Sequence, residues 1–331
     1  MVIPPAIAAL PRFGLIDGPS PLAPLRRLSA TLGGTAEIWI KREDLLPLAF
    51  GGNKLRNLEF LVGAALADGA DTLITSGRRW SNHCRLTAAA GARAGLAVEL
   101  VLSGPPPVAG AEGPNQHLDE LLGATVHVTA TGERAERATV VERVAAKVRA
   151  RGGRPFVIGV GGTGPIGAAG QVLAGLELAD QLTEAGVGDA TIVLPTATGG
   201  TQAGVLTGLA LAVPPQRTVL GIAVAAPGIE LRPAVEAILA GLEPLVGGRV
   251  PPGAVVIEDD QIGAGYGQPA PAADEASRLL ARTEGILVDP IYTAKALAGL
   301  VARVRDGRLA GPVVFWHAGG GPGIFERLGQ G

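Results

Sequence analysis

The stretch from Trp39 to Arg85 decides the fold, and it reads WIKREDLLPLAFGGNKLRNLEFLVGAALADGADTLITSGRRWSNHCR. A short apolar run typical of a buried strand enters a loop with Gly51 and Gly52, and a helical pattern follows near 54–69. A second apolar run then ends in a polar loop and an Ala-rich helix. Strands that alternate with helices in this way predict a parallel sheet, in which ligands bind at the carboxyl ends of the strands.

The same alternation continues through the rest of the chain. Strands are predicted at Glu37–Lys41, Thr72–Thr75, Val98–Leu102, Thr125–Val128, Phe156–Ile158, Thr191–Leu194, Thr218–Val224 and Val313–Trp316. Helices are predicted near 54–69, 82–94, 115–122, 134–150, 166–186, 200–212, 231–241, 270–283 and 292–306. Continuous Val, Ile and Leu strands between helices predict an α/β fold with mostly parallel sheets covered on both faces. We expect two domains, a larger one of residues 1–49 and 161–331 and a smaller α/β domain of residues 50–160.

Composition argues against several classes of partner. The 28 Lys and Arg residues nearly balance the 30 Asp and Glu residues, so neither nucleic acid nor an anionic membrane is expected as a partner. Two uncharged windows, 155–176 and 190–216, are long enough to span a bilayer, but glycines and prolines interrupt both. The single cysteine, Cys84, cannot form an internal disulfide, and no metal site is predicted from one cysteine and four histidines. We therefore expect a soluble, cytoplasmic protein.

Lys54 is the first candidate for chemistry. Gly51 and Gly52 allow a sharp turn, which places Lys54 in the first turn of the predicted helix. The positive end of a helix favours a neutral amine over a charged one, and a neutral amine is what a Schiff-base lysine needs. From spacing alone, a surface lysine near a helix start is the more common explanation of such a short motif.

A second candidate group lies in the loop from Arg78 to His83, RRWSNH. The loop follows a strand and precedes a helix, so in a parallel sheet it lies at the ligand-binding edge. Helix capping accounts for Ser81 or Asn82, but it does not account for a Ser-Asn-His run behind two arginines and a tryptophan. His83 alone is weak evidence, since a histidine on a helix is more often packed than catalytic.

The third group is a loop rich in threonine and glycine, in which Thr198-Gly199-Gly200-Thr201 opens a predicted helix. Successive backbone N–H groups at a helix start bind anions, and glycine lets a phosphate approach closely. No lysine follows the glycines, so the loop is not a Walker P-loop and suits a small phosphate on a cofactor better. An ordinary strand-to-helix turn is the alternative. The glycine loop 161–164 is a weaker candidate of the same kind.

The two tyrosines of the chain, Tyr266 and Tyr292, both lie beside turn-forming residues. Both rings can therefore face a cleft, although two ordinary half-buried aromatic residues explain the positions equally well. The segment FWHAGGGPG, from Phe315 to Gly323, ends a predicted strand in a further glycine loop.

Taken together, these segments resemble the fold-type II pyridoxal-phosphate enzymes, and most of all the group of D-cysteine desulfhydrases and 1-aminocyclopropane-1-carboxylate deaminases. The resemblance runs from KREDL at residue 41 to GGGPGIF at 319–325, and five motifs occur in the family's order. It implies a two-domain fold like that of the tryptophan synthase β subunit. It also implies bound pyridoxal 5′-phosphate, a small amino acid as substrate and a homodimer.

The resemblance implies catalytic roles for four residues. Lys54, in GGNK, would form the Schiff base with the cofactor, and Ser81, in SNH, would face the substrate carboxylate or the reacting carbon. Tyr266 and Tyr292 match a pair of active-site tyrosines, one of which could act as general acid for the leaving group. Substrate contacts are expected from the neighbouring loop, namely Arg78, Trp80, Ser81, Asn82 and His83.

The cofactor contacts follow in the same way. Asn82 would hydrogen-bond the phenolic oxygen, and the loop from Thr198 to Thr201 would hold the phosphate. Thr293 matches the desulfhydrase form of its motif, where the deaminases have a glutamate beside the pyridine nitrogen. A carboxylate keeps that nitrogen protonated and strengthens the electron sink, whereas a hydroxyl does not compel protonation. Thr293 therefore favours α,β-elimination from D-cysteine or a β-substituted analogue, which yields a keto acid, ammonia and a leaving group such as sulfide.

Three departures from the family pattern leave the substrate open. Arg78-Arg79-Trp80 stands where the family has small residues and a glutamine, Asn57 replaces a lysine, and Ala318 replaces a threonine. Two arginines suit a substrate with an additional anionic group, because guanidinium binds carboxylate, sulfonate or phosphate in a bidentate way. Alternatively, one arginine points to solvent or pairs with an acid.

Three alternatives to a desulfhydrase follow. The first is a 1-aminocyclopropane-1-carboxylate deaminase. The second is a specialised elimination or β-replacement on an anionic substrate that Arg78 and Arg79 bind. The third is a protein that binds the cofactor or an amino acid without turnover, and the intact Lys54, Ser81 and Asn82 argue against it.

Overall fold

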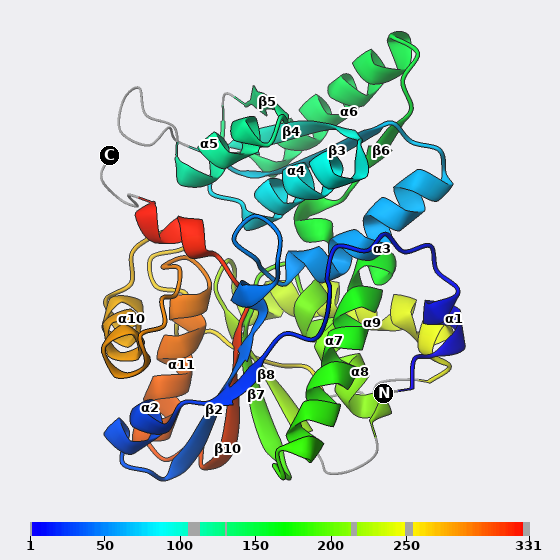
Figure 1. Cartoon of the computed structure of the whole chain (residues 1–331). Coiled ribbons are helices and arrows are strands. Elements are labelled where there is room, and N and C mark those ends of the chain that lie inside the picture. The colour runs from blue at the N-terminus through cyan, green and yellow to red at the C-terminus, as the bar shows by residue number, and fades with distance from the viewer. Residues whose placement is uncertain (1, 105–112, 130, 213–216, 249–253, 327–331) are drawn as a thin grey trace.

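The computed structural model describes residues 2–104, 113–129, 131–212, 217–248 and 254–326. Its strands form two separate sheets, a six-stranded one and a four-stranded one, and Figure 1 shows the smaller sheet above the larger. The fold is α/β with mainly parallel sheets, as the sequence predicts.

The smaller sheet is parallel throughout, in the order β5-β4-β3-β6. Its strands are β3 (Thr72–Arg78), β4 (Ala97–Ser103), β5 (Thr125–Val128) and β6 (Pro155–Val157). The helices that accompany it are α4 (Asn82–Ala94), α5 (Pro114–Leu121) and α6 (Arg134–Ala150). Helices α4 and α6 both pack on β3 and β4, so the central strand β3 is buried over most of its length.

The larger sheet has the order β1-β2-β10-β7-β8-β9, and among these described strands β1 is the one that pairs antiparallel. Its strands are β1 (Leu22–Pro24), β2 (Ala36–Arg42), β7 (Ala190–Thr196), β8 (Arg217–Ala223), β9 (Val256–Glu258) and β10 (Gly311–His317). Its helices are α1 (Pro5–Ala8), α2 (Arg26–Thr31), α7 (Pro165–Glu184), α8 (Gly200–Leu211), α9 (Gly228–Val246), α10 (Pro271–Glu284) and α11 (Thr293–Arg305). Helix α3 (Lys54–Ala67) shares a hydrophobic core with the smaller sheet and also packs on α7. Single 3-10 turns lie at η1 (Glu43–Leu45), η2 (Val160–Gly162) and η3 (Gly321–Phe325).

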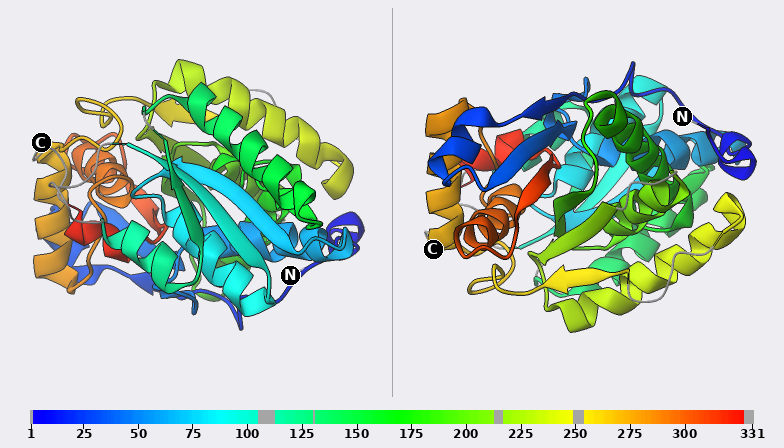
Figure 2. Two further views of the ribbon diagram at one scale, coloured as in Figure 1. Left: turned by 90° about the horizontal axis from the view of Figure 1, so that it is seen from above. Right: turned by 90° about the horizontal axis from the view of Figure 1, so that it is seen from below.

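Both faces of the larger sheet are covered, which explains its continuous apolar strands. Along β10, Val313 and Phe315 belong to the core under α11, whereas Val314 and Trp316 belong to the core under α7 and α8. Viewed from below, α11 lies on one side of the sheet and α7 and α8 lie on the other (Figure 2). Because successive side chains of a strand point to opposite faces, a strand buried on both faces needs apolar residues at every position.

The predicted strands and long helices are present, and the differences have physical causes. The sequence pattern does not predict strands β1 and β9, because each has three residues and is too short to show alternation. Helix α9 runs from residue 228 to 246 instead of 231 to 241, although Pro233 and Pro244 lie inside it. Its apolar face, Leu231, Val235, Ile238 and Leu242, is buried over its whole length, and this packing outweighs the cost of the prolines.

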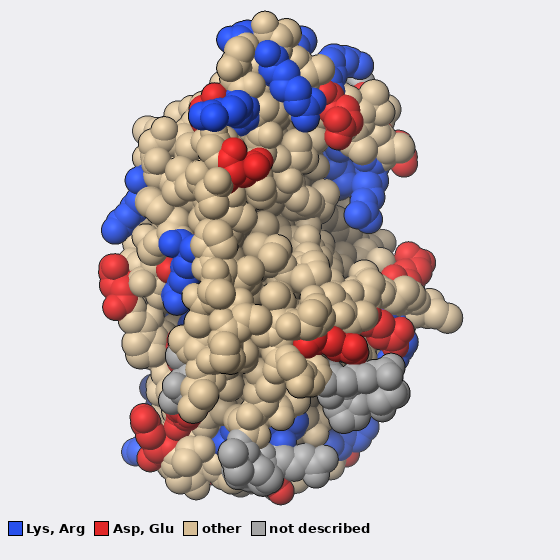
Figure 3. Space-filling view, turned by 90° about the vertical axis from the view of Figure 1, so that its right-hand side faces the viewer, with Lys and Arg blue, Asp and Glu red and all other residues tan. Residues whose placement is uncertain are grey.

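Charges of both signs surround the face shown in Figure 3. Lys and Arg side chains are most frequent at its top, and acidic side chains lie above and below a broad, mostly uncharged middle. No described helix is both long enough and apolar enough to cross a membrane. Within the same described residues, no group of three or more His, Cys, Asp and Glu side chains could hold a metal ion.

Candidate active site

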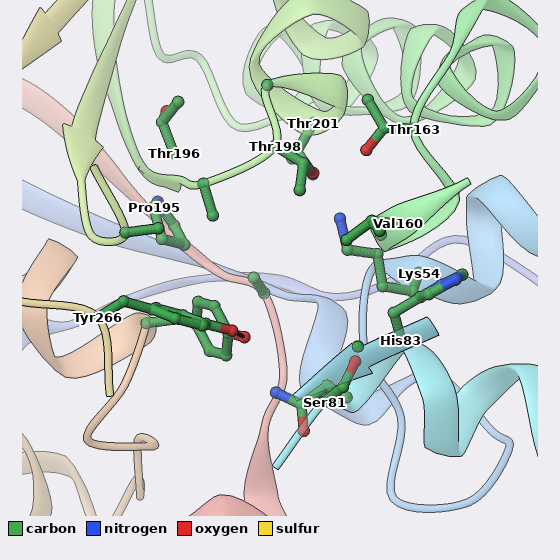
Figure 4. Close-up of a pocket in the computed structure, with 18 of the residues that line it drawn as sticks. Lys54, Ser81, His83, Val160, Thr163, Pro195, Thr196, Thr198, Thr201 and Tyr266 are labelled. Atoms are coloured by element: carbon green, nitrogen blue, oxygen red, sulfur yellow. Dashed lines mark hydrogen bonds between the residues drawn. The ribbon is translucent and has the colours of Figure 1, made fainter. Parts of the chain in front are cut away.

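A cavity of about 550 Å³ lies where the carboxyl ends of β3, β7 and β10 meet. Figure 4 shows Thr163, Thr198 and Thr201 on one side of it, Ser81 and Tyr266 on the other, and Lys54 between them. The cavity therefore brings together residues from loops that are far apart in the sequence. The cavity thus lies between the two sheets, at the strand ends where parallel sheets bind small molecules.

The loop before Lys54 is held rigidly against its neighbours. Gly51 has φ 64°, and a Cβ there would lie 2.2 Å from the carbonyl oxygen of Asp44, so glycine is required. Nearby, Asn53 donates its backbone N–H to the carbonyl of Ala318 over 2.9 Å and its side-chain amide to Thr201 Oγ1 over 2.8 Å. These bonds fix the point at which α3 begins with Lys54.

Lys54 has the altered acidity that its position predicts. Burial lowers the pKa of the Lys54 amine to about 8. The positive end of α3, which the sequence analysis names, acts in the same direction as this burial. At pH 7 about one amine in ten is then neutral, compared with fewer than about one in a thousand for an ordinary lysine.

Asn82 is oriented by hydrogen bonds from behind. Its side-chain oxygen accepts from Arg85 Nη1 over 2.9 Å and from the amide of Asn115 over 3.3 Å. With the oxygen occupied, the NH₂ group of Asn82 is the part that can serve the cavity, as a donor. Ser81 caps α4 as predicted, and its hydroxyl accepts from the backbone N–H of Cys84 over 3.2 Å.

His83 lines the cavity as a neutral ring. Thr75 donates its hydroxyl proton to the carbonyl of Ile158 over 2.8 Å, so it accepts from His83 Nε2 over 3.0 Å. The proton is thereby assigned to Nε2, and Nδ1 carries a lone pair. Burial, and secondarily the charge of Lys54, lowers the pKa of His83 to about 3. His83 therefore presents an acceptor and not a cation to the cavity.

The predicted phosphate loop forms one end of the cavity. Gly199 has φ 85° and precedes α8, whose first N–H groups have no partner within the helix. The glycine loop 161–164 faces it, and the sequence analysis ranks this loop as the weaker candidate for binding a phosphate. A Cβ on Gly161 would lie 2.8 Å from Thr198 Oγ1 and 3.1 Å from Thr163 Oγ1, so both hydroxyls converge on this glycine. Sequence reasoning misses Thr163 as a site residue, although the run GGTG before a helix contains the signal.

The two tyrosines form the opposite end of the cavity. Their hydroxyls are in hydrogen-bond contact, and their ring centroids are 5.9 Å apart. Burial raises the pKa of Tyr266, and burial together with Tyr266 raises the pKa of Tyr292 well above its ordinary value. Both phenols therefore keep their protons at neutral pH and can donate them. Trp80 packs behind Tyr266, with centroids 6.0 Å apart, and does not line the cavity.

Thr293 lines the cavity beside Tyr292 and begins α11. Its hydroxyl donates to the Asp289 carboxylate and accepts from the backbone N–H of Asp289 over 2.9 Å. Asp289 in turn accepts from the backbone N–H groups of Ile291 and Tyr292. The Thr293 hydroxyl is therefore oriented by a buried carboxylate that itself lines the cavity.

The two loop arginines are separated by the fold. Arg79 donates to the carbonyl of Gly104 over 3.0 Å and to Gln116 Oε1 over 2.8 Å, and it does not line the cavity. Arg78 does line it, together with Arg134 and Arg137 from α6. The structure also explains Asn57, which stands where the family pattern has a lysine. Its side-chain amide donates to the carbonyl of Gly162 over 3.0 Å and so supports the loop that contains Thr163.

Comparison with known proteins assigns the family. The model of the family described as pyridoxal-phosphate dependent enzyme matches residues 14–319. The D-cysteine desulfhydrase of Salmonella newport is 40% identical over 329 residues, which are 96% of this chain and 97% of the relative, and that of Salmonella heidelberg matches equally. The chain belongs to the pyridoxal-phosphate dependent enzymes, and pyridoxal phosphate is its cofactor.

Solved structures agree with this assignment. An ACC deaminase homologue superposes with a TM-score of 0.87 and 35% identity, covering 97% of this chain and 95% of the homologue. The threonine deaminase isoform 2 of Solanum lycopersicum has the same fold, with a TM-score of 0.66 and 20% identity over 95% of this chain and 87% of its own. The predicted fold-type II architecture and family are thus confirmed.

The residues of the cavity fit pyridoxal phosphate. The start of α8 and the hydroxyls of Thr163 and Thr198 supply donors for a phosphate, and the Asn82 amide and Thr293 hydroxyl can serve a ring between them. Three buried polar atoms of the lining have no partner in the part of the chain that the structure describes: Thr163 Oγ1, His83 Nδ1 and Arg137 Nε. The unpaired hydroxyl of Thr163 lies at the phosphate end of the cavity, where a phosphate oxygen can pair with it. The unpaired Nε of Arg137 lies at the end that holds the tyrosines.

Proposed function

We propose that the protein is a lyase that removes the β-substituent of a small amino acid, D-cysteine or a β-substituted analogue. The products are a keto acid, ammonia and the leaving group, which is sulfide for D-cysteine. The observation that carries the proposal is the position of Lys54 between a phosphate cradle and a pair of protonated tyrosines. The 40% identity to D-cysteine desulfhydrases over nearly the whole chain supports the same conclusion.

In this proposal Lys54 is the attachment point of the cofactor and the base for the Cα proton. When bound, pyridoxal phosphate supplies an electron sink for the substrate's Cα. The buried amine, with its pKa near 8, is neutral often enough at physiological pH to accept a proton. Ser81 faces the substrate carboxylate or the reacting carbon, and the start of α4 directs backbone N–H groups to the same region.

Tyr266 and Tyr292 act as the general acid for the leaving group. Their raised pKa values keep the protons in place until negative charge develops on the leaving atom. Because the two hydroxyls are in contact, a proton given up by one can be replaced from the other. Asn82, Thr293 and the loop from Thr198 to Thr201 hold the cofactor in this scheme.

Thr293 favours elimination over opening of a cyclopropane. Thr293 would hold the cofactor's ring nitrogen without compelling its protonation, so the electron sink that the cofactor supplies would be weaker than one that a carboxylate supports. A weaker sink suffices for a good leaving group such as a thiolate. A deaminase acting on 1-aminocyclopropane-1-carboxylate is the second candidate, and the likeness to an ACC deaminase homologue is what favours it.

We further propose a cytoplasmic homodimer with a larger domain, residues 1–49 and 161–331, and a smaller domain, residues 50–160. The two separate sheets support the division into domains. Sedimentation velocity of the purified protein tests the dimer, and limited proteolysis tests the domain boundaries.

The absorbance spectrum of the purified protein, before and after addition of D-cysteine, tests the proposed function. We expect a visible band from the covalently bound cofactor, a change of that band with D-cysteine, and release of keto acid and sulfide. Lys54→Ala should lose the band, and its rate of keto acid release should fall by a factor of about 10³ or more, as expected for removal of a covalent catalyst. A band that ignores D-cysteine but responds to 1-aminocyclopropane-1-carboxylate would instead support the deaminase.

A further inference from the structure

Three arginines meet at the end of the cavity that holds the tyrosines. Arg78 comes from the end of β3, and Arg134 and Arg137 come from the first turn of α6. Both Arg78 and Arg137 are close enough to Tyr266 to influence the acidity of its phenol or to be influenced by it. This arginine cluster (Arg78, Arg134 and Arg137) joins two segments that are separated by more than fifty residues in the sequence.

Gly132 brings two of these guanidinium groups together. A Cβ on Gly132 would lie 2.5 Å from Arg78 Nη1, so a larger residue there would displace the guanidinium group of Arg78. The carbonyl of the same glycine accepts from Arg137 Nη1 over 3.1 Å, and Ser103 Oγ accepts from that nitrogen over 2.6 Å. The guanidinium groups of Arg78 and Arg137 thus both lie against Gly132, and hydrogen bonds fix that of Arg137.

This arrangement is unfavourable for the protein alone. Arg137 is only 8% exposed, and its Nε is buried without a hydrogen-bond partner among the described residues. None of the ion pairs between described residues includes Arg78, Arg134 or Arg137. Burial and the neighbouring charges of Arg78 and Arg134 accordingly lower the pKa of Arg137. Buried or clustered cations of this kind are normally offset by an anion.

The acidic residues of the lining do not supply that anion. Glu230 is exposed on α9, and Asp289 is occupied by the hydroxyl of Thr293 and the backbone N–H groups of residues 291–293. The cofactor phosphate does not supply it either, because its cradle lies at the opposite end of the cavity, beyond Lys54 (Figure 4). The position beside Tyr266 is the one that a substrate's β-substituent occupies in the proposed function.

We propose that the arginine cluster binds an anionic β-substituent of the substrate. The inference rests on the proposed function and narrows its substrate class. Elimination requires the group to leave with an electron pair, which a β-carboxylate cannot do but an oxyanion of sulfur or phosphorus can. The substrate is therefore an alanine that carries a sulfonate or a phosphate ester on Cβ, and D-cysteine itself is a poorer substrate.

The reaction balances without an oxidant or a reductant. The Cα–H bond breaks and its proton passes to Lys54, while the Cβ–S or Cβ–O bond breaks and its electron pair leaves on sulfite or phosphate. Water then hydrolyses the carbon–nitrogen bond of the three-carbon product and releases the nitrogen as ammonium. One amino acid and one water give pyruvate, ammonium and the oxyanion. The arginine cluster stabilises the charge that develops on the leaving group, which is where such stabilisation accelerates the step.

The test compares anionic and neutral β-substituents on the holoenzyme. Cysteate and O-phosphoserine, each as both enantiomers, carry the two candidate anions, and 3-chloroalanine carries an uncharged β-substituent that leaves as chloride. We expect Arg137→Gln and Arg78→Gln to lower the ratio of kcat/KM for the preferred anionic substrate to that for 3-chloroalanine by about 10². Arg134→Gln changes an exposed residue and so does not endanger folding, and it should lower the same ratio by about tenfold or less.

Arg79→Gln is the matched control. Arg79 is the neighbour of Arg78 in the sequence, but it contacts Gly104 and Gln116 outside the cavity, so the ratio should stay within about twofold of the parent. Binding provides a second measurement that needs no turnover. 3-Sulfopropionate lacks the amine and cannot react, and calorimetry should show that it binds the parent at least about tenfold more tightly than propionate does. Arg137→Gln should abolish that difference.

The outcomes separate this inference from the proposed function. If 3-chloroalanine and D-cysteine yield keto acid but neither cysteate nor O-phosphoserine does, the inference is overturned and the lyase remains. An equal loss with anionic and neutral substrates in Arg137→Gln and Arg78→Gln overturns it too, since that result indicates a structural role. If none of the amino acids yields keto acid while the cofactor band is present, the proposed function itself fails.

Discussion

The side-chain amide of Asn53 donates a hydrogen bond to Thr201 Oγ1 over 2.8 Å, and it thereby joins the residue before Lys54 to the second residue of α8. Both residues are buried, and Gln171 Nε2 donates to the backbone carbonyl of Asn53 over 2.8 Å. One cofactor molecule must span from the lysine to the phosphate cradle. This bond fixes the distance between the two before any cofactor arrives.

Asn53→Ala should weaken the cofactor's binding. Loss of the bond leaves a buried hydroxyl without its donor and lets the two loops separate, at a cost of about 1–3 kcal/mol. We expect the dissociation constant of pyridoxal phosphate to rise about tenfold, measured by titration of the apoprotein. Thr207→Ala is the control, because its hydroxyl bonds within α8 to Ala203, more than one helical turn from the cradle. An unchanged constant in Asn53→Ala would show that the cradle does not depend on this link.

Gly161→Ala should close the phosphate cradle. The new Cβ would lie 2.8 Å from Thr198 Oγ1, so it would occupy the space between the two loops. It would also strain the backbone, because Gly161 has φ 74°. Gly186→Ala is the matched control, since Gly186 has φ 70° but open space around it. A left-handed alanine costs each variant about 1–2 kcal/mol. Only Gly161→Ala should also lower the affinity for pyridoxal phosphate, by about tenfold or more; equal affinities in the two variants would contradict the assigned cradle.

His83 should make the protein less stable in mild acid. Its pKa is about 3 in the folded chain, and about 6.5 when unfolded, so below pH 6.5 the unfolded state binds the additional proton. The stabilisation is complete above pH 6.5 and is lost as the pH falls toward 3, by about 1.4 kcal/mol per unit. His83→Gln should therefore reduce the change in unfolding free energy between pH 7 and 5.5 by about 1 kcal/mol.

Urea unfolding at the two pH values measures this difference. The same substitution at the exposed His117 of α5 serves as the control for replacing a histidine elsewhere. Parent and His83→Gln curves that change in parallel with pH would refute the neutral assignment of His83.

Asp119 should make the protein less stable as the pH rises, which is opposite to the effect of His83. This buried carboxyl of α5 has no hydrogen-bond partner on either oxygen within the described residues, and burial raises its pKa to about 8, although the charge of Arg85 lowers it in part. The folded state keeps a proton that the unfolded state loses above about pH 4. Its contribution to stability is therefore complete below about pH 4 and is lost as the pH rises toward 8, at about 1.4 kcal/mol per unit.

Asp119→Asn removes this titration. We expect the variant to gain stability relative to the parent as the pH rises from about 5 to about 8, measured by chemical unfolding across that range. A constant difference between the two proteins would mean that Asp119 is ionised in the folded state throughout.

The sequence by itself determined the local parts of the site. Glycines before Lys54 and within Thr198–Thr201 specify turns, and a strand followed by a polar helix start places Ser81 and Asn82 at a sheet edge. These features depend on residues a few positions apart, whose backbone preferences are intrinsic. The order of the motifs was then enough to predict the family, the fold and the cofactor.

Only the tertiary structure decided which side chains share the cavity. Arg78 and Arg79 are adjacent and chemically equal, yet one faces the cavity and the other is bound outside it, because consecutive residues of an extended chain point to opposite faces. Trp80 supports Tyr266 instead of lining the cavity. Thr163 and Arg137 enter from segments whose positions depend on packing between distant parts of the chain, and no local pattern encodes that packing. The chemistry common to the family is therefore readable from short motifs, whereas the charge that faces the substrate is set by the fold.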